Sequence, residues 1–118
     1  MNAKLRTLFS SDVDDLSAYQ PSDEAFCISV RALIGPAGEP GAESFDFDVC
    51  SPTWLAQAIA RDGIVSGHHR FFMIAFNYDL LERHVLKLVS QASGADWHEV
   101  ASKLIRWSHW EFEDYVPS

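Results

Sequence analysis

The chain has few of the residues that build metal or catalytic sites. Its 118 residues include only two cysteines, Cys27 and Cys50, which are too few for a zinc site of their own. The five histidines form no H-E-x-x-H or H-x-x-H pattern. His68 and His69 are adjacent, and in a strand they would point to opposite faces. We therefore expect no metal site, no cofactor and no catalytic residue.

Basic residues are scarce as well. Nine Lys and Arg stand against 17 Asp and Glu, which gives a formal net charge of −8. Nucleic acids and anionic membranes repel such a protein. No segment approaches the roughly 18 apolar residues of a membrane helix, and the first residues lack the apolar stretch of a secretory signal. We expect a cytoplasmic protein that binds neither nucleic acid nor membranes and keeps its thiols reduced.

Apolar residues are abundant and spread along the chain. They make up 47% of it, and aromatic residues make up 13%. A chain of this length buries roughly two thirds of its unfolded surface, enough for a core without metal or disulfide crosslinks. We predict one domain over residues 1–118 of the α+β class. It should contain an antiparallel sheet of about four to five strands with two to three helices packed on it.

Two alternating segments, 26–34 and 43–49, flank the turn sequence GPAGEPGAE and predict a hairpin. The turn contains three glycines and two prolines, which no helix tolerates at this density. If Ile34 pairs with Glu43, the apolar residues of both strands share one face and Arg31 lies opposite Asp46. A slip of two residues would preserve these faces.

The same register places Cys27 opposite Cys50. Two cysteines in a pair of opposing residues without mutual backbone hydrogen bonds are able to oxidise. Reduced thiols packed side by side remain the expectation for a cytoplasmic protein.

The remaining segments predict three helices, a candidate first strand in the short mixed segment 3–9, and one more strand. Ser51 is a good N-cap for a helix over 52–62, which should lie across the sheet. Segment 68–76 has apolar residues at both odd and even positions, which predicts a central strand covered on both faces. Helical periodicity marks 77–93, and a further helix should begin after Asp96.

Carboxylates are the candidates for a binding surface. Asp46 and Asp48 share the polar face of the hairpin, and Glu111 and Glu113 share a face if residues 110–116 form a strand rather than an irregular helix extension. Such residues are most often simply solvated, but an acidic surface beside aromatic anchors is also suited to a basic protein partner. The candidate partner-binding residues are Asp46, Asp48, Trp110, Glu111, Glu113, Asp114 and Tyr115. Trp110 and Tyr115 are the aromatic anchors of this set, with membership of the core as the alternative for either.

Three motifs follow one another in this chain. The first is D-x-D-D-L at 12–16, and the last is W-E-F-E-D-Y at 110–115. The second lies within 34–55 and consists of the glycine-proline turn, the strand sequence E-S-F-D-F-x-V-C and the helix start S-P-x-W-L. In this order they resemble the immunity protein 8 family of bacterial polymorphic toxin systems. The resemblance implies a cytoplasmic, non-enzymatic antitoxin that binds and neutralises a co-encoded toxin domain. It assigns no contact residue. The alternatives are a small ligand-binding or regulatory domain with no toxin partner and, more remotely, an acid-dependent hydrolase.

Overall fold

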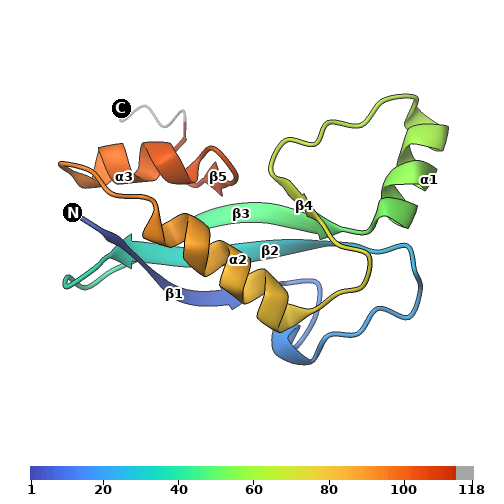
Figure 1. Ribbon diagram of the computed structural model, residues 1–118, viewed down its shortest axis with the longest axis horizontal. Helices are drawn as coiled ribbons and strands as arrows, with labels where there is room; N and C mark the ends of the chain where they lie inside the picture. The colour runs from blue at the N-terminus through green and yellow to red at the C-terminus, as the bar shows by residue number, and fades with distance from the viewer. Residues whose placement is uncertain (114–118) are drawn as a thin grey trace.

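The computed structural model describes residues 1–113. The strands are β1 (Ala3–Phe9), β2 (Cys27–Pro36), β3 (Glu43–Cys50), β4 (Arg70–Phe72) and β5 (His109–Trp110). The helices are α1 (Pro52–Asp62), α2 (Tyr78–Ser90), α3 (Trp97–Leu104) and the short 3-10 helix η1 (Leu16–Ala18). The predicted α+β class, with five strands and three α-helices, is confirmed (Figure 1).

The five strands form one sheet in the order β1-β2-β3-β4, and β5 also pairs with β3. The pairs β1–β2, β2–β3 and β3–β5 are antiparallel, whereas the three residues of β4 run parallel to the end of β3. This parallel pair follows from the connection, because α1 carries the chain back before β4 begins. Strands β5 and β4 therefore occupy the same edge of β3, one near its start and the other at its end.

The hairpin has the predicted register along its whole length. Ile34 pairs with Glu43, and Arg31 pairs with Asp46. The turn brings the two strands very close at Gly35, where a Cβ would overlap the carbonyl oxygen of Gly41. Glycine is therefore required at position 35 by close backbone approach, which explains part of the conspicuous turn sequence.

One face of the sheet forms the core together with α2, which crosses β1, β2 and β3 (Figure 1). Helix α2 buries Leu81, Val85 and Val89, as its periodicity predicts. Helix α3 adds Val100 and Leu104. The hairpin contributes buried apolar residues from its predicted face: Ile28, Val30, Ala32, Ile34, Phe45, Phe47 and Val49. Strand β1 adds Leu8.

Helix α1 does not lie across the sheet, and that prediction is wrong. Its ends are as predicted, since Ser51 Oγ accepts from the Trp54 N–H at 3.1 Å and Gly63 follows the helix with a φ of 83°. Ala58 is its one buried residue, Ile59 is 42% exposed, and the helix stands beyond the end of β3 (Figure 1). Because α2 already covers the inner face, a helix that buries one small side chain stays at the end of the sheet.

Segment 68–76 is not a central strand covered on both faces, and that prediction is also wrong. Only the three residues of β4 are extended, and they form the edge of the sheet. Phe71 and Met73 pack against the core, whereas Phe72 is 43% and Ile74 is 84% exposed. The two sets of alternate apolar residues in this segment therefore have different environments, one packed on the core and one exposed. The sequence pattern alone does not distinguish such a segment from a strand covered on both faces.

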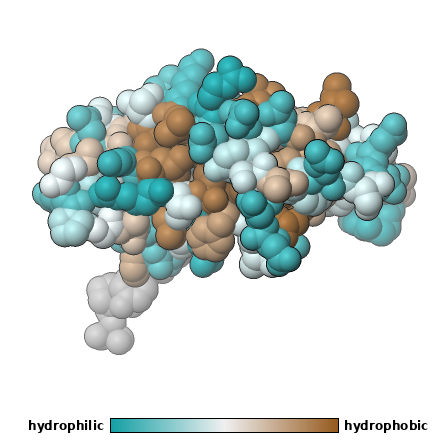
Figure 2. All heavy atoms as spheres, turned by 90° about the horizontal axis from the view of Figure 1, so that it is seen from below, coloured by the Kyte–Doolittle hydropathy of each residue, from teal (hydrophilic) through white to brown (hydrophobic). Residues whose placement is uncertain are grey.

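Exposed apolar side chains do not form one continuous area on the face seen from below. Figure 2 shows them as separate areas among hydrophilic side chains. Within residues 1–113, no helix has the length and apolar character needed to cross a membrane.

Candidate functional site

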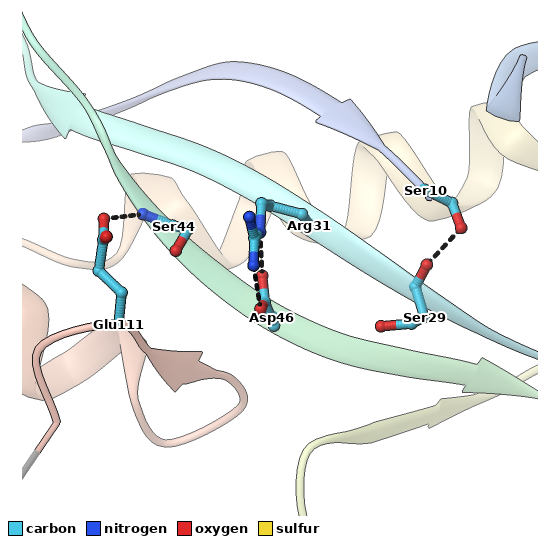
Figure 3. Close-up of polar contacts among 6 residues, drawn as sticks. All are labelled: Ser10, Ser29, Arg31, Ser44, Asp46 and Glu111. Atoms are coloured by element: carbon cyan, nitrogen blue, oxygen red, sulfur yellow. Dashed lines mark hydrogen bonds and ion pairs between the residues drawn. The ribbon is translucent and has the colours of Figure 1, made fainter. Parts of the chain in front are cut away.

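The side of the sheet opposite α2 is polar, and we call it the open face. It carries alternate residues of the first three strands, among them Phe9, Ser29, Arg31, Asp46 and Asp48. Figure 3 looks onto this face, with α2 behind the strands. The alternation that buries Phe45, Phe47 and Val49 on the inner face directs the aspartates of β3 outward, as the register predicts.

Arg31 and Asp46 form the central contact of the open face. Arg31 Nε donates to Asp46 Oδ1 at 2.8 Å, and its Nη2 donates to Oδ2 at 2.9 Å (Figure 3). The hydrogen bonds to Asp46 raise the pKa of Arg31, so the guanidinium stays charged. The side chains are 49% and 32% exposed, and such a pair contributes about 1 kcal/mol or less to stability. Its main effect is to fix the orientation of the Asp46 carboxylate.

Asp48 lies two residues further along β3 and faces Arg70 of β4. The closest charged atoms, Arg70 Nε and Asp48 Oδ2, are 3.8 Å apart. Burial raises the pKa of Asp48, Arg70 lowers it, and the nearby carboxylates of Asp12 and Asp46 raise it further. The guanidinium of Arg70 also lies over the ring of Trp54, with its Cζ atom 5.6 Å from the ring centre. Arg70 thus connects the open face to the first turn of α1.

Two hollows on the open face share Asp46. The smaller one, about 110 Å³, is lined by Phe9, Ser11, Ser29, Arg31 and Asp46. The larger one, about 260 Å³, is lined by Asp46, Phe47, Asp48, His68, His69, Arg70 and His109. Their linings place carboxylates, guanidinium groups and imidazoles next to one another, an arrangement suited to contacting a partner that carries both charged and hydrogen-bonding groups.

The histidines beside the larger hollow lie together, which the sequence did not predict. His68 and His69 precede β4 in a turn rather than a strand, and their ring centres are 3.6 Å apart. His69 has a φ of 58°, and its carbonyl accepts from the Asp48 N–H at 2.9 Å. The ring of His109 is 6.2 Å away from that of His69. Burial and the neighbouring His68 lower the pKa of His69, which favours its neutral form.

The closing segment contributes two carboxylates to the same edge. Strand β5 ends at Trp110, and a turn follows, so Glu111 and Glu113 do not extend a strand. Glu111 Oε1 accepts from the Ser44 N–H at 2.7 Å (Figure 3), while its own N–H donates to the Ser44 carbonyl. Glu113 Oε2 lies 3.0 Å from His109 Nδ1. Glu111 thus continues the β3–β5 pairing with its side chain.

Trp110 is on the other side of the sheet from the β3 aspartates. Its ring is stacked on Phe45, with centres 6.2 Å apart and planes at 2°, and it also contacts Phe112 and His98. Phe45 is fully buried, so Trp110 covers part of the core. Of the remaining candidate residues, Asp114 and Tyr115 lie outside the described residues.

Asp12 is an additional carboxylate at this site that the candidate set omitted. It follows β1, and its Oδ2 accepts from the Ser29 N–H at 2.8 Å. Ser10 supports the same strand end, since its hydroxyl donates to the Ser29 carbonyl (Figure 3). The D-x-D-D-L motif contains Asp12, but its spacing alone does not show that it reaches β2.

Among residues 1–113, no three His, Cys, Asp or Glu side chains are grouped so that they could hold a metal ion. A hollow of about 670 Å³ lies away from the open face, between residues 20–24 and 74–76. Its lining includes Ile74, whose side chain is 84% exposed, so the hollow is open to solvent.

The comparisons with known proteins identify the family. A model of the family Immunity protein 8 matches residues 3–115. The chain belongs to the Immunity protein 8 family. The resemblance seen in the three motifs is thereby confirmed, and membership of this family implies a role as an immunity protein in a toxin system. Searches of curated proteins and of solved structures found no match.

Proposed function

We propose that this Immunity protein 8 member is the antitoxin of a toxin–immunity pair. It binds, in the cytoplasm, a toxin domain encoded by a neighbouring gene, and it blocks that domain without catalysing a reaction. The observation that carries the proposal is family membership over residues 3–115. An antitoxin of this kind needs a stable surface rather than a catalytic centre, and the open face is rigidly positioned by three paired strands.

The toxin contact in this proposal is the open face together with the closing segment. Asp46 and Asp48 contribute fixed carboxylates, and Glu111 and Glu113 lie along the same edge of β3. Asp114 extends the acidic segment in the sequence, and Tyr115 is its proposed aromatic anchor, whereas Trp110 packs on Phe45 on the other side of the sheet and is assigned to the core. A net charge of −8 favours a toxin with a basic surface, such as the substrate-binding surface of a nuclease.

Charge complementarity acts mainly on the rate of association. Carboxylates at the rim of an interface attract a basic partner before contact, and salt screens that attraction beyond about 10 Å at 0.1 M ionic strength. Removal of two carboxylates from the open face should therefore slow association more at low salt than at high salt.

The test is association of the protein with the purified toxin domain encoded by the neighbouring gene. We expect the double variant Asp46→Asn, Asp48→Asn to associate about 3- to 10-fold more slowly at low salt, with the difference shrinking as salt increases. Glu111→Gln combined with Glu113→Gln should act in the same direction. Glutamine retains an oxygen able to accept from the Ser44 N–H, so the β3–β5 pairing is kept.

The matched control removes two carboxylates elsewhere. Glu24 precedes β2, and Asp79 is exposed in the first turn of α2 on the other side of the sheet. Glu24→Gln with Asp79→Asn changes the net charge equally, so it separates a local contact from the effect of overall charge. An equal loss of rate in both double variants would contradict the open face as the contact. No binding of the unmodified protein to the neighbouring toxin would contradict the antitoxin function itself.

A further inference from the structure

The two cysteines of the chain lie opposite each other at the start of β2 and the end of β3. Cys27 pairs with Cys50 in the observed register, and their Sγ atoms are 2.7 Å apart. Both thiols are free. The proposed binding of a toxin does not account for this pairing of the only two cysteines in the sequence.

The backbone hydrogen bonds show which type of pair this is. The Ser51 N–H donates to the Phe26 carbonyl at 2.9 Å, and the Phe26 N–H donates to Ser51 Oγ at 3.0 Å. Residues 26 and 51 thus form a hydrogen-bonded pair. Since such pairs alternate along an antiparallel ladder, Cys27 and Cys50 form a non-hydrogen-bonded pair, in which the two Cα atoms approach to about 4.5 Å. That separation lies within the range spanned by disulfides, about 4.4–6.8 Å.

The two thiols differ in access to solvent. Cys27 is half-buried, whereas Cys50 is fully buried. A small oxidant can therefore reach Cys27 first, and Cys50 is placed to react only with Cys27. Burial raises the pKa of both thiols, which makes the exchange slower than for an exposed cysteine.

We propose that Cys27 and Cys50 are a site of reversible oxidation, at which a small-molecule disulfide converts the two thiols into a cross-strand disulfide between β2 and β3. The Cys27 thiolate attacks one sulfur of the small disulfide and releases its other half as a thiol. The Cys50 thiolate then attacks Cys27 Sγ and releases the second half. In total the protein loses two hydrogens and two electrons, and the small disulfide is reduced to two thiol molecules.

The new bond joins positions that the ladder already holds opposite each other, so the strands need little movement. It would restrain the end of β3, where Ser51 begins α1 and where Asp48 faces Arg70. A crosslink that closes the hairpin removes conformational freedom from the unfolded chain. The oxidised protein should therefore melt on the order of 10 °C higher than the reduced protein.

The experiment treats the reduced, folded full-length protein with oxidised glutathione and follows its intact mass after acid quenching. We expect the mass of two hydrogens to be lost, without a glutathione adduct or a covalent dimer, and dithiothreitol to restore it. Peptide mapping should locate the bond between Cys27 and Cys50. Thermal unfolding with and without dithiothreitol then measures the shift in melting temperature.

Two single variants act as controls. Cys50→Ser should accumulate a glutathione adduct on Cys27, because the second step is blocked. Cys27→Ser should stay unmodified while folded, because Cys50 is buried. Two free thiols persisting in the wild-type protein, or a stable adduct on it, would overturn the proposal even if neither variant folds. None of these measurements involves a toxin, so they are independent of the antitoxin function.

Discussion

The junction between the sheet and α1 gives the sharpest stability prediction. Ser51 is fully buried, and its Oγ accepts two backbone hydrogen bonds, from the Phe26 N–H at 3.0 Å and from the Trp54 N–H at 3.1 Å. One bond completes the β2–β3 ladder, and the other caps α1. Replacement of Ser51 with alanine removes the acceptor of both bonds and leaves the backbone conformation accessible.

The expected cost follows from the two bonds. Loss of an N-cap serine costs about 1 kcal/mol. A buried backbone N–H that loses its acceptor costs about 1–3 kcal/mol, and the Phe26 N–H is in a buried position. Ser51→Ala should therefore lower the free energy of unfolding by about 2–4 kcal/mol, a large share of the roughly 5–15 kcal/mol of a typical domain.

Urea unfolding followed by tryptophan fluorescence measures this difference, with the slope m as a check that the transition stays two-state. Ser102→Ala is the matched control, since Ser102 is exposed on α3 and its hydroxyl donates only to the Glu99 carbonyl. That variant should stay within about 0.5 kcal/mol of the wild type. A cost of less than about 1 kcal/mol for Ser51→Ala would refute the reasoning, because it would mean that one of the two donors finds another partner.

Two further predictions concern the candidate site. In urea unfolding, Trp110→Ala should destabilise the protein by about 2–3 kcal/mol because it uncovers Phe45, whereas Trp110→Phe should cost less than about 1 kcal/mol. If Trp110→Ala instead weakens toxin binding without lowering stability, Trp110 is an anchor of the interface. Burial, the largest influence on Asp48, raises its pKa in the folded state, so its charge opposes folding above the unfolded pKa of about 3.9. In urea titrations, the free energy of unfolding of the wild type minus that of Asp48→Asn should thus fall as pH rises from about 3 to about 7. A rise of this difference over the same range would mean that the attraction of Arg70 outweighs the effect of burial.

The hairpin could be predicted from the sequence because several local signals agree. Alternation fixes the inner and outer faces of β2 and β3, and Gly35 marks the tight turn that brings Ile34 to Glu43. Ser51 and Gly63 bound α1 to the residue. Each of these features depends on residues close in sequence, where steric and hydrogen-bonding rules act directly.

The flanks of the sheet could not be predicted in the same way. The positions of α1 and β4 depend on which element covers the inner face, and α2, which does so, comes later in the chain. The turn at His68 and His69, the bond from Asp12 to Ser29 and the contact between Glu111 and Ser44 all join residues from separate elements. Their side-chain types alone do not determine such partners. Among the candidate residues, only the outward orientation of Asp46 and Asp48 on β3 followed from the sequence.

The pairing of charges changes what kind of surface the open face is. The excess of carboxylates belongs to the chain as a whole, whereas on β3 Asp46 meets Arg31 and Asp48 meets Arg70. A basic group of a partner that approaches Asp46 competes with a bidentate guanidinium that is already in place. Attraction through net charge is therefore long-range and general, and close contact depends on where both signs lie. In the proposed toxin complex, Arg31 and Arg70 thus belong to the recognition surface as much as the aspartates do, because they orient the carboxylates and present donors of their own to the partner.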